Sequence, residues 1–168
     1  VLPLSKRQQR RVVRLSSLAA SSSRSVLAEL RSGASPVLQI AANPLFLGLL
    51  CEHVRNGGSP ADDLHSLFEA HVARQLQLGR QYGVDCDRAR QVACVVAYVM
   101  AREPGLGLSP GRDPLIAAAG KLGLLADNEL ETALDDLERV KLMRYDPNDN
   151  RASRATTFVH RRFQEYFA

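Results

Sequence analysis

The sequence predicts a mainly α-helical chain, in which a helical bundle is followed by a winged-helix domain with one β-hairpin. Apolar residues recur at helical spacing along most of the 168 residues, and turn signals separate these stretches. The pattern changes near the C-terminus, where residues 142–145 and 156–159 read as two strands around the polar stretch 146–150. Three helices followed by a hairpin is the winged-helix order of elements.

The first predicted domain, residues 1–81, consists of helices alone. Ser5 offers an N-cap for the first helix, and an Ala/Ser-rich stretch at residues 18–25 predicts a break after that helix. Asn43 and Pro44 open the most apolar segment of the chain, with proline at the favoured first helical position, so a buried helix is expected there. The helices are expected over residues 6–18, 26–33, 37–41, 44–55 and 59–81.

The second predicted domain, residues 82–168, begins at a junction over residues 82–85, which ends in the N-cap candidate Asp85. Three helices are expected after this junction, and the third is acidic with its apolar residues on one face. Its inward positions are Leu130, Leu134, Leu137 and Val140. The helices are expected over residues 86–102, through Leu115 to Leu122, and over 128–141.

Charge and cysteine content restrict the class of protein. The net charge of +4 comes from an arginine excess spread over several helices, so it does not by itself indicate nucleic-acid binding. No apolar run is long enough to span a bilayer, and the N-terminus lacks the order of a signal peptide. We therefore expect a cytoplasmic protein without a membrane partner. Cys51, Cys86 and Cys94 show no disulfide or zinc spacing and are expected to be reduced core thiols.

A basic stripe lies on the first predicted helix. Arg7, Arg10, Arg11 and Arg14 follow the spacing that places side chains on one helix face. The stripe is either a solvated face or a docking surface for an acidic partner. The pattern favours the solvated face, because charge stripes are common on surface helices.

Two segments of the chain resemble family hallmarks. Residues 43–50 read N-P-L-F-L-G-L-L, and residues 158–168 read F-V-H-R-R-F-Q-E-Y-F-A. The first resembles the N-P-L-x-L-x-x-L helix in the first helical domain of the NACHT family of STAND ATPases, which includes animal NOD-like receptors and bacterial immune relatives. The second resembles the F-x-H-x-x-F-Q-E-[YF]-x-A ending of the winged-helix domain of that family. Residues 2–5, with Gln8, resemble its entry from the last strand of the nucleotide-binding domain.

The resemblance implies a nucleotide-dependent switch with two site residues. Pro44 would pack against the adenine of ADP or ATP, and His160 would contact the β-phosphate of ADP in a closed state. An imidazole can donate a hydrogen bond to a phosphate oxygen, and its pKa would rise beside that charge. Two plainer interpretations stay open, in which Pro44 is an ordinary first-turn proline and His160 caps its helix or packs against the hairpin.

The resemblance also implies partners. A P-loop nucleotide-binding domain upstream of residue 1 would hold the phosphates and Mg²⁺. Nucleotide exchange in the full-length protein would lead to a homo-oligomer and to signalling, in immune or antiphage defence. The chain itself is not expected to be an enzyme, because it contains no G-x-x-x-x-G-K-[ST] motif: Gly120-Lys121 is flanked by leucines at the first glycine and hydroxyl positions. No catalytic residue and no metal ligand is assigned.

The final segment offers further candidates. Phe163, Tyr166 and Phe167 are spaced as if a terminal helix met the bundle, which favours core packing over an aromatic ligand box. Gln164 and Glu165 either orient His160, brace an interface or form an exposed pair.

The main alternative function is a winged-helix DNA-binding transcriptional regulator. Such a protein needs basic residues on the helix that enters the major groove. The helix before the hairpin is instead acidic, so phosphates would repel it and no specific nucleic acid is expected. A purely structural helical adaptor is a further alternative, which differs in that Pro44 and His160 would not converge on one cleft.

Overall fold

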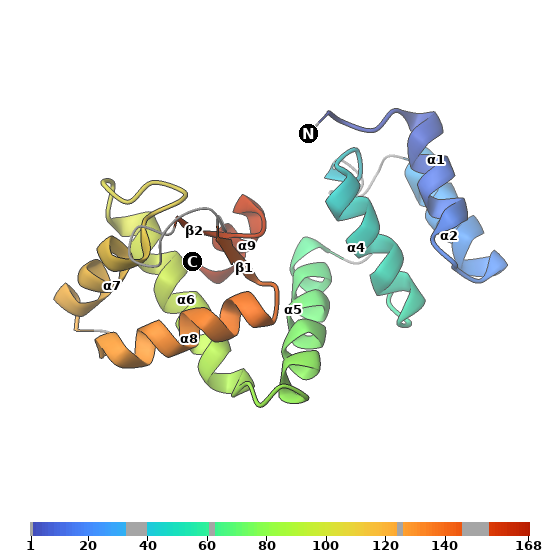
Figure 1. The fold of residues 1–168 in the computed structure, drawn as a ribbon. Helices are drawn as coiled ribbons and strands as arrows, with labels where there is room; N and C mark the ends of the chain where they lie inside the picture. Colours follow the sequence, from blue (N-terminus) through green and yellow to red (C-terminus); the bar gives the residue numbers. More distant parts are fainter. Residues whose placement is uncertain (1, 33–39, 61–62, 124–125, 146–154) are drawn as a thin grey trace. The chain divides into compact units, whose positions relative to one another are not determined.

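The computed structural model describes residues 2–32, 40–60, 63–123, 126–145 and 155–168. The chain is mainly helical, with 68% helix and eight helices among the described residues, and it has a small antiparallel sheet of two strands (Figure 1). The prediction of a mainly α chain with one hairpin is confirmed. Within these ranges no helix has the length and apolarity that a membrane crossing requires.

The chain divides into two compact units, Val1–His71 and Val72–Ala168, which are called unit 1 and unit 2. The division falls within helix α5, Leu64–Arg80. The predicted domains 1–81 and 82–168 remain a prediction, because a division inside one helix does not test which part folds independently.

Unit 1 begins with α1, Lys6–Leu15, where Ser5 is the N-cap as predicted and takes part in a reciprocal capping box. The Ser5 hydroxyl oxygen accepts a hydrogen bond from the Gln8 backbone N–H (3.3 Å), and Gln8 Oε1 accepts one from the Ser5 backbone N–H (2.8 Å). The helix ends before the predicted residue 18, because Ser17 adopts a positive φ of 56° that no α-helix can continue.

The predicted break over residues 18–25 is wrong in its extent. Helix α2 already begins at Ala20 and runs to Ser32. In a helix, serine is less favourable than alanine by only about half a kcal/mol per residue. Val26 and Leu30 are buried on this helix. Packing of that apolar face therefore outweighs local propensity. The predicted helix over residues 37–41 lies mainly outside the described residues.

The core of unit 1 is built on α4, Pro44–Arg55, as its apolar sequence predicts. Phe46 also makes an edge-to-face contact with Phe68 of α5, with 5.8 Å between the ring centroids. The side chains that α4 buries are Phe46, Leu47, Leu49, Leu50, Cys51 and Val54.

Unit 2 is organised around α6, Cys86–Arg102, which begins where Asp85 caps the backbone N–H groups of Asp87 and Arg88. Two further helices follow, α7 over Arg112–Lys121 and α8 over Asp127–Arg139. The apolar face predicted for α8 is confirmed. Leu130, Leu134, Leu137 and Val140 are at most 3% exposed.

The hairpin joins β1, Met143–Tyr145, and β2, Thr156–Phe158, with Met143 opposite Phe158. A single bridge adds a third segment, since Gly111 pairs antiparallel with Ala155 just before α7 begins. Helix α9, Arg161–Phe167, follows β2 directly. The polar stretch predicted at residues 146–150 lies outside the described residues.

The expectation that all three cysteines are core thiols is wrong for one of them. Cys51 and Cys86 are buried, whereas Cys94 is exposed. Its helix α6 turns Ala93 and Val96 inward, and the 100° step between successive residues carries Cys94 to the outer face.

Candidate functional site

Pro44 is the first residue of α4, and its ring is exposed. Asn43 caps the same helix, with its side-chain oxygen accepting from the Leu45 backbone N–H at 2.9 Å. Leu45 is also 37% exposed. The start of α4 therefore presents apolar surface outward although the rest of the helix is buried, and the first-turn role of this proline is confirmed.

The N-terminal segment that resembles a strand exit lies against this helix start. The Leu4 backbone N–H donates to the Ala42 carbonyl oxygen at 2.6 Å. The Gln9 side-chain amide donates to the Leu4 carbonyl oxygen at 3.2 Å, and Gln9 is buried. Leu4 and Ala42, which are 38 residues apart in the sequence, are thus joined beside Pro44.

His160 is the N-cap of α9, in extended backbone with φ −154° and ψ 146°. Its Nδ1 accepts a hydrogen bond from the Arg162 backbone N–H at 3.1 Å. This bond needs an unprotonated Nδ1, so the neutral ring carries its proton on Nε2. The capping interpretation is confirmed, and Nε2 is the nitrogen with a proton to donate.

The surroundings of His160 are electropositive. Burial lowers the pKa of His160, the positive charges of Arg162 and Arg144 lower it further, and Glu165 alone among the neighbours raises it. The imidazole is therefore neutral at pH 7 in the ligand-free chain. The rise in pKa predicted beside a phosphate would have to come from the phosphate itself.

Glu165 is tied to two arginines of its own helix. Its Oε1 lies 3.1 Å from Arg161 Nε, and its Oε2 lies 2.8 Å from an Arg162 terminal nitrogen. Glu165 is exposed, as one of the predicted alternatives had it, but Gln164 is only 9% exposed, so an exposed pair is wrong for Gln164. Neighbouring residues of a helix point about 100° apart, which places one side chain inward and the other outward.

Phe163 and Phe167 of the final segment pack in the core, as predicted, whereas Tyr166 is only half-buried. Phe163 is fully buried, and Phe167 stacks on Phe158 with 5.7 Å between the ring centroids. Tyr166 meets Phe167 edge to face and accepts a hydrogen bond from Arg90 of α6 at 3.0 Å. This packing fixes α9 against unit 2 and so fixes the position of its N-cap.

Pro44 belongs to unit 1 and His160 to unit 2, and each is fixed by contacts within its own unit. Their convergence on one nucleotide stays a prediction. In the described part of the chain no group of three or more His, Cys, Asp or Glu side chains is arranged to hold a metal ion.

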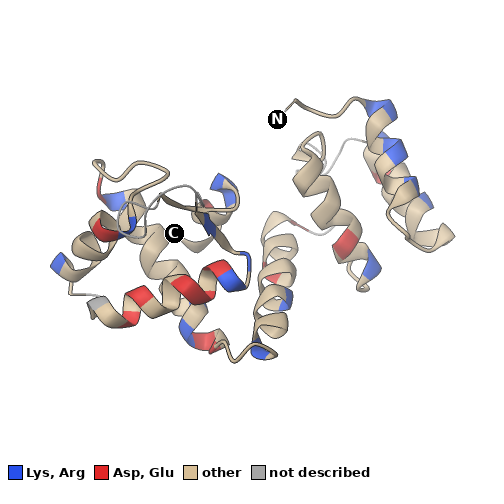
Figure 2. Cartoon of the chain, viewed as in Figure 1, with Lys and Arg blue, Asp and Glu red and all other residues tan. Residues whose placement is uncertain are grey.

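The basic stripe of α1 is exposed along its whole length, and Figure 2 shows it as a run of blue on that helix. Arg7, Arg10, Arg11 and Arg14, together with Leu15, line a shallow hollow. A solvated face is what the ligand-free chain presents, and docking of an acidic partner stays open.

Sequence patterns did not point to two further groups. One is Arg112, whose guanidinium is buried between α7 and α8. The other is a cavity beside α9 that Gln164 helps to line. Both depend on how separate helices meet, so no local pattern could have signalled them.

The chain matches no family model, no curated protein and no solved structure.

Proposed function

We propose that this chain is the helical and winged-helix regulatory portion of a NACHT-type STAND ATPase. It closes over ADP and responds to nucleotide exchange, which leads to homo-oligomerisation and signalling, in immune or antiphage defence and in the cytoplasm. Its direct partner is an upstream P-loop nucleotide-binding domain. That domain supplies the phosphate loop and the Mg²⁺ site.

The observation that carries the proposal is how the segment 158–168 folds. Phe158, Phe163 and Phe167 are buried, while His160 lies at the junction between β2 and α9. The apolar positions of the motif are thus used for packing, whereas its histidine is half-buried at the start of α9, which it caps. An imidazole held by its Nδ1, with the proton on Nε2, is oriented to donate a hydrogen bond to an oxyanion.

Electrostatics around His160 favours the same ligand. The positive charges of Arg144 and Arg162 act on the ring, and Glu165 opposes them only in part. An anion would be attracted to this junction, because the positive charges of the two arginines exceed the negative charge of Glu165. The β-phosphate of ADP has the charge and the acceptor oxygens that such surroundings suit.

Element order supports the winged-helix assignment of unit 2. Gly111, which lies between α6 and α7, bridges to Ala155 just before β2, and the two helices α7 and α8 then lead into the hairpin. The Thr156 backbone N–H also donates to the Pro110 carbonyl oxygen at 2.8 Å. A bridge from the segment between the first two helices to the residue before the last strand fits a winged-helix domain better than a plain helical bundle with a terminal hairpin.

Pro44 has a separate part in the proposal. The exposed ring at the start of α4 offers a flat apolar surface, which suits contact with an adenine face. The joined N-terminal segment would bring the end of the nucleotide-binding domain to this helix start. ADP held from both units would restrain unit 2, and nucleotide exchange would remove the bond to His160 and with it that restraint.

The test uses the full-length parent protein loaded with ADP and two substitutions of one residue. His160→Ala removes both the helix cap and the proposed phosphate contact. His160→Asp keeps a capping oxygen, which serves well at an N-cap, but directs a negative charge at the phosphate. Because a hydrogen bond to a charged group contributes about 1.5–3 kcal/mol, both variants should release ADP about tenfold faster or more.

Stopped-flow release of a fluorescent ADP analogue and size-exclusion profiles measure the outcome. We expect faster release and oligomerisation without the trigger for both variants. Folded variants that retain ADP like the wild-type protein would leave His160 with the capping role alone and would refute the proposed switch contact.

The alternative function, a DNA-binding winged helix, meets an electrostatic obstacle. Helix α8 has six acidic residues and one arginine, and Figure 2 shows several red bands along it. Duplex DNA carries one negative charge per about 1.7 Å of helix axis, so this helix would be repelled from the major groove. A gel-shift assay at near-physiological salt should show no sequence-specific duplex binding by the 168-residue chain.

A further inference from the structure

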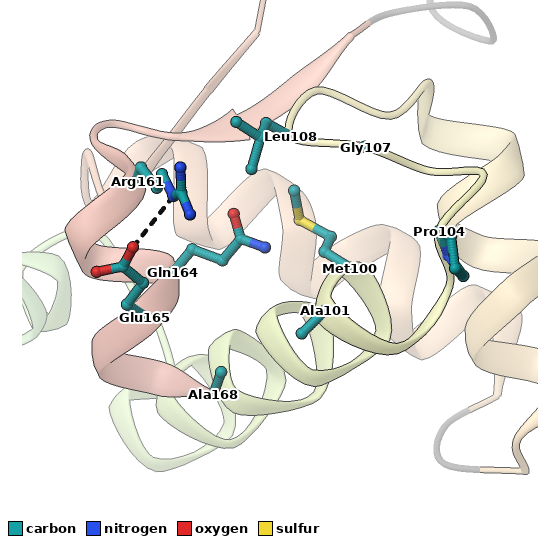
Figure 3. A pocket seen from close by; sticks show the side chains of 9 residues that line it. All are labelled: Met100, Ala101, Pro104, Gly107, Leu108, Arg161, Gln164, Glu165 and Ala168. Atoms are coloured by element: carbon teal, nitrogen blue, oxygen red, sulfur yellow. Dashed lines mark ion pairs between the residues drawn. The ribbon is translucent and has the colours of Figure 1, made fainter.

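A cavity of about 360 Å³ lies within unit 2, between the end of α6, the loop over residues 104–108 and α9 (Figure 3). It contains neither Pro44 nor His160 and is not part of the proposed nucleotide site. Its volume is near the lower end of the roughly 300–1,000 Å³ found for small-molecule sites. It is called the α6–α9 cavity.

The loop that forms one wall is held in place. The Thr157 hydroxyl donates to the Leu108 carbonyl oxygen at 2.9 Å, and the Leu106 backbone N–H donates to the Glu103 carbonyl oxygen at 3.0 Å. Gly107 takes a positive φ of 63°, which glycine adopts without strain. The wall is therefore formed before any ligand arrives, which lowers the entropic cost of binding.

The walls are mainly apolar. Met100 and Pro104 line the cavity, and so does Leu108, whose side chain is 53% exposed. Covering the exposed Leu108 side chain with an apolar group would remove apolar surface from water, which favours binding. Methionine adapts its shape to different contacts, so the cavity suits a compact hydrocarbon or ring.

One polar group points into this apolar space. Gln164 is only 9% exposed, its amide is directed into the cavity in Figure 3, and it has no hydrogen-bond partner among the described residues. Its amide atoms are not among the fully buried polar atoms that lack a partner, so they are open to the cavity. A bound group that accepts a hydrogen bond from the amide would satisfy this donor where the residue is otherwise shielded from water.

The charge at the rim identifies the acceptor. Arg161 lines the cavity and meets Glu165 through its Nε, so the terminal nitrogens of its guanidinium are not used in that contact. Glu165 is shared with Arg162, which leaves these three side chains with a net positive charge. A guanidinium and an amide N–H side by side are the donors that a carboxylate accepts from.

We propose that the α6–α9 cavity binds a small apolar carboxylate. The carboxylate lies between the Gln164 amide and the Arg161 guanidinium, and the apolar part of the ligand lies against Met100 and Leu108.

The test uses the 168-residue chain with methyl-¹³C methionine, because the chain has only two methionines. Met100 lines the cavity, whereas Met143 is buried in β1 and serves as an internal control. The probe is 4-phenylbutanoate, and its neutral amide, 4-phenylbutanamide, is the matched control. We expect saturable shifts of the Met100 methyl signal with a dissociation constant of about 1 mM, no shift for Met143, and binding of the amide at least about tenfold weaker.

Two arginines provide a matched pair of variants. Both pair with Glu165, but only Arg161 lines the cavity. Arg161→Gln and Gln164→Leu should each weaken binding about tenfold, whereas Arg162→Gln should change it by less than about twofold. The proposal is overturned if Met100 does not respond, if the amide binds as tightly as the carboxylate, or if both arginine variants lose binding equally.

Discussion

Helices α1 and α8 carry charge patterns of opposite sign, and the fold uses them in different ways. Helix α1 has five basic residues and no acidic one, and none of the five forms an ion pair with a described residue. Helix α8 has six acidic residues, and several of them meet arginines from α6, α7 and α8 itself. The charge of α8 thus contributes to the structure of unit 2, while the charge of α1 is left to solvent or to a partner.

The difference has its source in a buried guanidinium. Arg112 is 1% exposed at the start of α7, with a terminal nitrogen 2.7 Å from Asp135 and another 4.0 Å from Glu138. It also donates to the Glu131 carbonyl oxygen. A buried charge is costly unless it is paired, so the buried Arg112 guanidinium needs the acidic residues that α8 places beside it. In contrast, all five basic side chains of α1 are exposed.

Among these substitutions, Arg112→Met is expected to reduce the free energy of unfolding the most. Removing one partner of a buried pair leaves the 11% exposed Glu138 carboxylate without its arginine. We expect a loss of about 3 kcal/mol or more in the free energy of unfolding, measured by urea denaturation. Arg11→Met on the exposed stripe is the matched control and should change it by less than about 0.5 kcal/mol. Equal effects would show that burial does not distinguish the two arginines.

A smaller effect tests the surface pairs of α8. Arg88 of α6 lies 2.8 Å from Glu129, and both side chains are at least one-third exposed. A double-mutant cycle with Arg88→Gln and Glu129→Gln should give a coupling of about 0.2–1 kcal/mol that decreases as salt is added. A coupling of about 3 kcal/mol, the size of the loss expected for Arg112→Met, would contradict the view that burial rather than proximity determines the strength of these pairs.

The smallest expected effect concerns α1. Arg10→Glu places an acid between Arg7 and Arg14, which are three and four residues away, and replaces repulsion with attraction. Unit 1 should become more stable by a few tenths of a kcal/mol, most clearly at low salt. Thermal unfolding at two salt concentrations measures this change. A loss of stability would instead indicate that Arg10 makes a favourable contact in the native chain.

Local signals predicted much of the fold. Ser5 and Asp85 cap helices where the sequence places N-caps, because capping depends on a side chain and the backbone two or three residues away. The apolar face of α8 and the presence of the hairpin follow from periodicity and turn signals alone. The extent of α2 did not follow, because packing of Val26 and Leu30 outweighs the weak propensity of serine.

The candidate site divides in the same way. The sequence of residues 158–168 was enough to predict that His160 begins a helix and that Phe163 and Phe167 pack in the core, because each depends on spacing between near neighbours in the chain. Only the tertiary structure decided that Arg112 is buried against α8 and that Gln164 faces a cavity between α6 and α9. Which polar groups lose water is determined by surfaces that meet from distant parts of the chain, and no local pattern contains that information.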